Sequence, residues 1–171
     1  MVAISIKIRP ETPNDIERIH EVTTAAFSSV AHSSNTEQYI VKALREGGAL
    51  AVSLVAEGAG DVVGHVAVSP VTISDGSSNW YGLGPISVDP ALQQKGIGSL
   101  LMRAALARLK VLNAAGCVLL GDPNYYVRFG FKSISGLTYA GVPPEYFQAV
   151  SFSGEFAQGE VAYHDGFGAT A

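Results

Sequence analysis

The chain has 171 residues, which suits one domain large enough to bury a core. Hydrophobic residues make up 47% of it and charged residues 15%, and this composition excludes an intrinsically disordered chain. The formal net charge of −4 argues against a general nucleic-acid binder, which would carry a basic patch. An anionic ligand could still bind through local backbone dipoles.

The sequence favours a reduced, cytoplasmic setting. Its single cysteine, Cys117, cannot form an intramolecular disulfide, and it lies in the apolar run "GCVLLG", which indicates a small core residue. The N-terminal "MVAISIKIRPET" does not resemble a signal peptide, and no apolar run is long enough to span a bilayer. Neither paired cysteines nor a His-x-x-x-His spacing occurs, so we expect no metal site and no membrane partner.

The first third of the chain predicts one strand and two helices. "ISIKIRP", residues 4–10, alternates in hydropathy like a strand. A helix follows over 12–27, with Thr12 as its N-cap and Pro13 at its first position. After a polar loop, residues 36–48 predict a second helix that ends at a glycine pair.

The middle of the chain predicts three strands and the longest helix. Two strands flank the turn "EGAGD", and a third ends in "WYGLGPISV", residues 80–88. Residues 99–112 then form a helix with an expected buried stripe of Ile97, Leu100, Leu101, Ala104, Ala105 and Leu112.

The last third predicts a wholly apolar strand, a short helix and two final strands. "CVLLG", residues 117–121, has the composition of a strand covered on both faces, and "DPNYYVRFGF" reads as a short helix ending at Gly130. The final strands are expected within 146–152 and 159–167. This order predicts an α/β fold with a mixed sheet, central hairpins and a right-handed crossover through the long helix.

A glycine pair lies at the start of the long helix, in "QQKGIGS". A helix start leaves N–H groups unpaired and carries partial positive charge, and glycines let an anion such as pyrophosphate approach it. Lys95 would add charge. The Walker pattern is absent, and a Rossmann fingerprint would need Gly or Ala where Leu101 stands. The alternative is that these glycines only allow tight packing of the loop.

The preceding strand is interrupted in "YGLGPISVDP". Gly82, Gly84 and Pro85 indicate a bulge, and a proline cannot donate to a neighbouring strand. Two parallel strands that part here would expose backbone groups to which an extended, amide-bearing ligand could pair. An ordinary bulged strand is the alternative.

An amide-bearing arm on the strand and a pyrophosphate at the helix start together describe coenzyme A. At these positions the sequence resembles the GNAT superfamily of acyl-CoA-dependent N-acetyltransferases, whose signature Gln/Arg-x-x-Gly-x-Gly/Ala matches residues 93–98. The resemblance implies one GNAT-like domain over 1–171, with a splayed strand pair and helices on both faces of the sheet. It also implies acetyl-CoA as cosubstrate, bound by Ile86, Ser87, Val88, Gln93, Gln94, Lys95, Gly96, Ile97, Gly98, Ser99 and Asn124.

A second motif of the family, a Tyr four residues before Gly-Phe, matches Tyr126 in "NYYVRFGF". The resemblance implies that Tyr126 is the general acid for the leaving thiolate, with Tyr125 as a second candidate; a packing role is the alternative. The run also resembles a bacterial GNAT subgroup with Gly-Asp-Pro-x-Tyr-Tyr. Many members have Asn where Leu119 stands here, so the resemblance leaves Asp122, Asn124 or backbone groups to bind the pantetheine arm.

The residue that deprotonates the acceptor stays open. Backbone N–H groups around Ser87 and Val88 could hold the oxyanion, but the interrupted strand lacks the carboxylate that often serves as base. Glu37, His65 and His32 are candidates, as is a chain of water molecules. A buried structural role for His65 and a first-turn helix role for Glu37 are the alternatives.

The resulting hypothesis is an N-acetyltransferase that moves acetyl from acetyl-CoA directly to a primary amine of a small molecule or peptide. The segment from Phe27 to Glu37 would line the acceptor side, and its small polar residues indicate a modest, polar acceptor. The alternative is a non-catalytic acyl-CoA sensor, which would keep the glycine motif without a base. The resemblance leaves a homodimer open.

Overall fold

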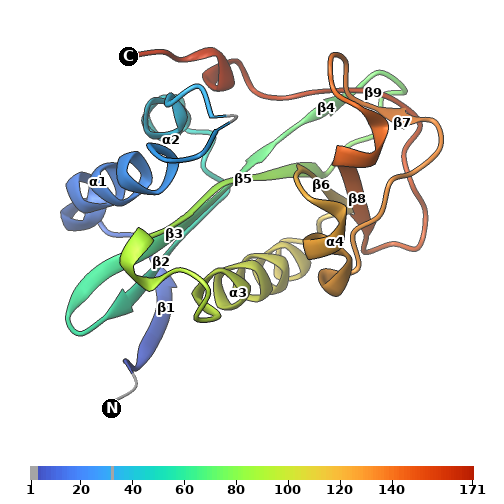
Figure 1. The fold of residues 1–171 in the computed structure, drawn as a ribbon. Helices are drawn as coiled ribbons and strands as arrows, with labels where there is room; N and C mark the ends of the chain where they lie inside the picture. Colours follow the sequence, from blue (N-terminus) through green and yellow to red (C-terminus); the bar gives the residue numbers. More distant parts are fainter. Residues whose placement is uncertain (1–3, 32) are drawn as a thin grey trace.

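The structure, a computed structural model, describes residues 4–31 and 33–171 (Figure 1). A six-stranded mixed sheet has the order β1-β2-β3-β5-β6-β8, in which only β5 and β6 are parallel. Its strands are β1 (Ile6–Pro10), β2 (Val52–Gly58), β3 (Asp61–Pro70), β5 (Trp80–Val88), β6 (Gly116–Leu120) and β8 (Phe147–Ser151). The helices are α1 (Ile16–Phe27), α2 (Glu37–Glu46), α3 (Ile97–Val111) and the short α4 (Pro123–Tyr126).

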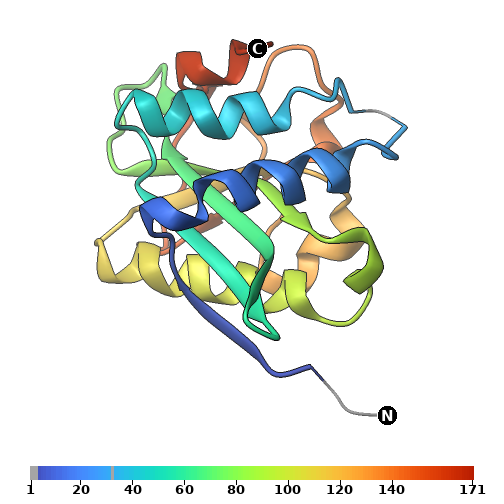
Figure 2. The ribbon, with the colours of Figure 1, turned by 90° about the vertical axis from the view of Figure 1, so that its left-hand side faces the viewer.

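The helices cover both faces of this sheet. Helices α1 and α2 lie together on one face and α3 lies across the other (Figures 1 and 2). The side chains of β3 alternate accordingly, because successive strand residues point to opposite faces. Val66 packs in one buried cluster with Leu101 of α3, and Ala67 packs in another with Ile19 of α1. The expected α/β architecture with helices on both faces is therefore confirmed.

Local sequence accounts for the helix starts. The amide of Thr12 donates to Asp15 Oδ2 at 2.7 Å in a capping box, with Pro13 at the first position of a 3₁₀ turn that leads into α1. The expected stripe on α3 is wrong at two positions. Leu100 and Leu112 are 44% and 45% exposed, whereas the helix buries Met102 and Leu109. The buried face of α3 follows Leu101, Met102, Ala105 and Leu109 at helical spacing, and Leu112 lies at the C-cap beyond the last helical residue.

The expected parting of two parallel strands is present. β5 pairs with β6 only over Trp80–Gly82 against Gly116–Val118, and the two strands diverge beyond that point. On its other edge β5 carries an extra residue against β3, because Leu83 lies opposite Val68 and Ile86 opposite Val66. Gly84 has a φ of 135° and precedes a cis peptide bond to Pro85 in this bulge.

The tail differs from the sequence-based expectation. Only Phe147–Ser151 of the tail joins the main sheet. A second, three-stranded sheet consists of β4 (Thr72–Ile73), β9 (Gly159–Ala162) and β7 (Leu137–Thr138), and the two short strands β4 and β7 were not predicted. Residues Asp165–Gly168 form a 3₁₀ turn rather than the end of a strand. This turn lies against α2, and His164 caps it by accepting a hydrogen bond from the Gly166 amide at Nδ1.

Candidate active site

The glycine loop forms the start of α3 and one wall of a cavity. Gln94 and Gly96 have φ values of 63° and 87°, which turn the chain sharply into the helix. The amide of Leu100 makes the first helical bond, to Gly96 O at 3.2 Å, so the N–H groups of residues 97–99 precede all intrahelical bonding. A cavity of about 410 Å³ lies over these groups; we name it the glycine-loop cavity.

Most of the predicted cofactor residues of this segment line the glycine-loop cavity. Its lining comprises Val88, Leu92, Gln93, Gln94, Gly96, Ile97, Gly98, Ser99, Tyr125 and Arg128. Lys95 is exposed and is not among them, whereas Arg128 supplies a cation that the sequence reasoning missed. The Arg128 guanidinium stacks 4.4 Å from the ring centre of Tyr125 and donates through Nε to the carbonyl of Tyr125. The spacing "YYVRF", with Arg128 one helical turn after Tyr125, was the available signal.

The open edge of β5 presents backbone groups to the strand gap. The amide of Asp89 donates to Val63 O of β3, so the alternation along a strand turns the Ser87 amide toward β3 as well. The amides of Ile86 and Val88 consequently face the gap that β6 leaves. This corrects the expectation that the Ser87 N–H could hold an oxyanion. The Ser87 hydroxyl is also engaged, in a 3.2 Å hydrogen bond with Thr23 of α1.

A second cavity, also about 410 Å³, lies along this edge; we name it the strand-gap cavity. It is lined by Ala26, Phe27, Val30, Ile86, Ser87, Val88, Gln93, Gly98, Tyr125 and Tyr126. Four of these residues also line the glycine-loop cavity, so the two hollows adjoin. A ligand with an anionic end and an extended amide arm could therefore occupy both.

Both tyrosines of the second motif reach the strand-gap cavity. The Tyr126 ring packs over Gly121, where any Cβ would collide with it, and lies 6.3 Å from the ring of Phe131. Burial, followed by the neighbouring Tyr125 and Asp122, raises the pKa of Tyr126 to about 12. The Tyr125 hydroxyl lies 3.4 Å from Ser99 Oγ at the helix start. Tyr126 therefore remains a protonated phenol at neutral pH, and Tyr125 lies nearer the glycine loop.

A third cavity, of about 250 Å³, lies beside the β5 bulge; we name it the bulge cavity. Its lining comprises Phe27, Glu37, Ile40, Leu83, Gly84, Pro85, Leu120, Tyr139, Tyr163 and Phe167. It shares Phe27 with the strand-gap cavity and adjoins it along β5. Glu37 is the single charged side chain in its lining, and Ser33 Oγ donates to Glu37 Oε1 at 2.6 Å.

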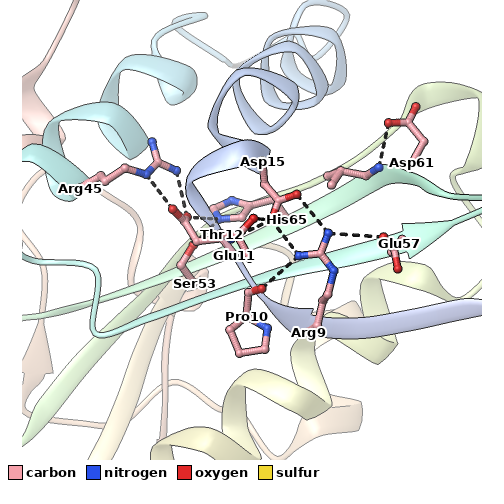
Figure 3. Close-up of polar contacts among 11 residues, drawn as sticks. Arg9, Pro10, Glu11, Thr12, Asp15, Arg45, Ser53, Glu57, Asp61 and His65 are labelled. Carbon is pink, nitrogen blue, oxygen red and sulfur yellow. Dashed lines mark hydrogen bonds and ion pairs between the residues drawn. The ribbon is translucent and has the colours of Figure 1, made fainter.

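His65, the other predicted base, lies outside all three cavities. Its side chain is completely buried in β3, within 2.8 Å of Ser53 Oγ and 3.7 Å from Glu11 Oε1 (Figure 3). Arg45 of α2 donates to both carboxylate oxygens of Glu11, at 2.8 and 2.9 Å. Burial lowers the pKa of His65 below its usual 6.5, despite the nearby carboxylate. The structure therefore supports the structural alternative for His65, in a network that joins β1, α2, β2 and β3.

Asn124, another predicted site residue, does not reach the site. Asn124 is exposed and lines none of the three cavities, and its amide donates to Asp122 Oδ1 as part of the α4 cap. His32 lies outside the described residues. His164 caps the terminal 3₁₀ turn, as an ordinary tail residue would.

Comparison with known proteins decides the family. The model of the acetyltransferase (GNAT) domain matches residues 49–133. The uncharacterized N-acetyltransferase YhbS of Escherichia coli strain K12 is 37% identical over 126 residues, which cover 73% of this chain and 72% of YhbS. The chain belongs to the GNAT acetyltransferase family. The resemblance expected from the glycine and tyrosine motifs is confirmed, and the enzyme class is acyltransferase.

Solved structures of this family share the fold over nearly the whole chain. A GNAT family acetyltransferase from Brucella melitensis, in complex with acetyl-CoA, is 50% identical with a TM-score of 0.86, covering 95% of this chain and 98% of that one. Escherichia coli YhbS in complex with CoA is 31% identical with a TM-score of 0.88, covering 100% and 96%. Sequence and fold therefore agree across these GNAT acetyltransferases.

Residues 4–31 and 33–171 contain neither a metal-binding cluster nor a membrane-spanning helix. Within these ranges no cluster of three or more His, Cys, Asp or Glu side chains is arranged to hold a metal ion. Over the same part of the chain, no helix has both the length and the apolar character needed to cross a bilayer.

Proposed function

We propose that this GNAT protein transfers the acetyl group of acetyl-CoA directly to a primary amine. The observation that carries the proposal is the succession of three adjoining cavities. The first lies on the free N–H groups of α3 with Arg128, the second follows the open edge of β5, and the third opens beside Glu37. They suit a pyrophosphate, an amide-bearing arm and an acceptor, respectively. The relatives from Brucella melitensis and Escherichia coli bind acetyl-CoA and CoA.

The glycine-loop cavity fits a pyrophosphate in detail. Gly98 faces Tyr125, whose hydroxyl would be only 3.5 Å from a Cβ at this position, so the missing side chain keeps the helix start open. Backbone N–H groups and the helix dipole attract anions there, and Arg128 adds a full charge. Val88, which lines both cavities, would pair with the pantetheine arm through its backbone.

The reaction needs two proton movements, and the chain offers a group for each. The amine nitrogen forms a bond to the carbonyl carbon, and the carbon–sulfur bond breaks. The backbone N–H of Ile86, which faces the gap farther from the glycine loop, stabilises the carbonyl oxygen as it gains charge. The Tyr126 hydroxyl donates its proton to the departing thiolate, and its raised pKa keeps it protonated for this step.

Of the two predicted bases, we propose Glu37 as the group that meets the amine. Its carboxylate lies in the bulge cavity next to the strand gap, whereas His65 is sealed in the core by Ser53, Glu11 and Arg45. The excess proton of the amine would pass to Glu37 and from there to water. We further propose that residues 1–171 act as one domain, and in the cytoplasm, where acetyl-CoA is available.

The proposal is tested by the release of CoA thiol from acetyl-CoA with a broad panel of primary amines. Acetyl-CoA binding is measured in the same samples by calorimetry. We expect acetyl-CoA binding together with amine-dependent release that falls sharply in Tyr126→Phe. Binding without release for every amine would favour the acyl-CoA sensor, and absence of binding would overturn the proposed function altogether.

A further inference from the structure

The bulge cavity combines one carboxylate with a largely apolar wall that includes four aromatic rings. Tyr163 lies directly on Gly82 of β5, where any Cβ would collide with its ring. The Tyr163 ring makes an edge contact with Tyr139 at 5.1 Å and lies 4.8 Å from Phe167. Phe27, at the end of α1, completes the wall where this cavity meets the strand gap. The wall is thus assembled from α1 and from two separate parts of the tail.

Packing against α2 and β5 fixes the positions of the aromatic residues of the tail. Phe167 packs against a buried cluster that contains Ile40 and Leu44 of α2. Tyr163 is partly buried, and desolvation raises the pKa of its phenol. Rings held in this way lose little conformational entropy when a ligand binds, so they form a preformed surface for a flat apolar group.

Glu37 brings a negative charge into this largely apolar cavity. Its carboxylate accepts a hydrogen bond from Ser33, but among residues 4–31 and 33–171 no Lys, Arg or His forms an ion pair with it. A carboxylate beside apolar walls is stabilised by a cation that binds there. Aromatic faces attract the same cation through their quadrupoles. The charge and the wall together favour an ammonium ion attached to an apolar body.

The same lining disfavours other amine classes. A polyamine or aminoglycoside would place a second ammonium against apolar walls that hold one carboxylate only. An amino acid would bring its own carboxylate near Glu37, where none of the lining residues among 4–31 and 33–171 is a cation. A volume of about 250 Å³ suits a small molecule.

We propose, building on the proposed transferase function, that the acceptor is a small arylalkyl primary amine. Its ring lies against Tyr163, Phe167 and Phe27, and its ammonium binds Glu37. This assignment replaces the modest polar acceptor indicated by the loop sequence, because the tail supplies three of the four aromatic rings in the lining. Glu37 then favours ligands that carry an ammonium group, and the aromatic rings favour ligands that carry an aryl group.

The test compares a charged probe with its neutral isostere. Binding of 2-phenylethylamine and 2-phenylethanol to the enzyme–CoA complex is measured by calorimetry in wild type, Glu37→Gln and Glu46→Gln. Glu46 is an exposed carboxylate on the same helix that does not line this cavity. We expect Glu37→Gln to weaken the amine by about tenfold with little effect on the alcohol, as loss of a charge-assisted contact predicts. Glu46→Gln should change neither.

A second pair of variants tests the aromatic wall. Phe167→Leu keeps apolar volume and removes a ring, and Phe152→Leu makes the same change at a partly buried ring outside the bulge cavity. Phe167→Leu should raise the KM for 2-phenylethylamine severalfold more than the KM for n-butylamine, and Phe152→Leu should raise neither. Thermal melts confirm that each variant is folded.

The outcomes separate this inference from the function on which it rests. Turnover of spermidine, lysine or a lysine peptide in preference to 2-phenylethylamine would overturn the arylalkylamine assignment while the transferase stands. Equal losses for amine and alcohol in Glu37→Gln would overturn the ammonium role of Glu37. Failure to bind CoA, or binding without turnover of any amine, would instead remove the proposed function.

Discussion

Replacement of Tyr126 by phenylalanine tests the chemistry most directly, because the structure separates its ring from its hydroxyl. The ring packs over Gly121 and beside Phe131, and phenylalanine preserves these contacts. The variant loses only the hydroxyl group, and burial raises the pKa of that group to about 12 in the wild type. We therefore expect the free energy of unfolding to change by less than about 1 kcal/mol, within the range of a lost weak polar contact.

The expected kinetic effect is much larger than the effect on stability. Proton donation by a positioned acid contributes about 10²- to 10⁴-fold in rate, which corresponds to about 3–5 kcal/mol of transition-state stabilisation. kcat should fall by this factor in Tyr126→Phe, and the KM for acetyl-CoA should change less than about threefold because the binding groups remain. In wild type, Tyr126 should cause no loss of kcat between pH 7 and pH 10, since its pKa of about 12 keeps it protonated there.

The assay is steady-state release of CoA thiol at saturating amine, with Tyr125→Phe as the matched control. Tyr125 reaches both the glycine-loop and the strand-gap cavities, so its hydroxyl should affect acetyl-CoA binding more than kcat. Retention of more than half of the wild-type kcat in Tyr126→Phe would refute the general-acid role. A large loss of kcat in Tyr125→Phe alone would transfer that role to Tyr125.

Three further predictions concern the anion site and the buried network. Gly98→Ala should fold normally, since its Cβ would lie 3.5 Å from Tyr125 Oη, but should raise the KM for acetyl-CoA by about tenfold by covering the helix N–H groups. Arg128→Ala should weaken acetyl-CoA binding severalfold at low salt and less at high salt, whereas Lys95→Ala should matter little. Glu11→Gln should lower the free energy of unfolding by about 2–3 kcal/mol in urea titrations, because it leaves Arg45 without its carboxylate. An unchanged KM in Gly98→Ala, unchanged acetyl-CoA binding in Arg128→Ala, or an unchanged urea midpoint in Glu11→Gln would contradict the corresponding assignment.

The same network predicts how stability depends on pH. His65 is neutral in the fold with its pKa lowered by burial, so below about pH 6.5 the unfolded chain binds a proton that the folded chain does not. Burial tends to raise the pKa of Glu11, but hydrogen bonds from His65, Arg45 and Ser53 outweigh it and hold the pKa well below 4.5. Both groups therefore reduce stability as pH falls, from about 6.5 for His65 and from about 4.5 for Glu11. Urea midpoints from pH 7.5 to pH 4 measure this, and an unchanged midpoint between pH 7 and pH 5.5 would contradict the neutral, buried state of His65.

Local patterns in the sequence were sufficient for the main elements and for the cofactor side of the site. The capping box at Thr12, the αL glycine at the end of "NYYVRFG" and the glycine pair before α3 each act through neighbouring residues, so they can be read without tertiary structure. The interruption at Gly84 and Pro85 likewise predicted the parting of β5 from β6, because proline cannot donate in a strand ladder. These features depend on backbone conformation and hydrogen bonding over a few residues.

The residues of the proposed acceptor side could be identified only from tertiary packing. Glu37 and His65 were equal candidates in the sequence, and they separated because α2 carries one into a cavity while β3 seals the other among Ser53, Glu11 and Arg45. The aromatic wall comes from the tail, some 80 residues after the strand on which it packs, and no local spacing connects Tyr163 with Gly82. Contacts between distant segments are set by how whole elements pack, so a sequence reveals the cofactor motif of this enzyme far more readily than the chemistry of its acceptor.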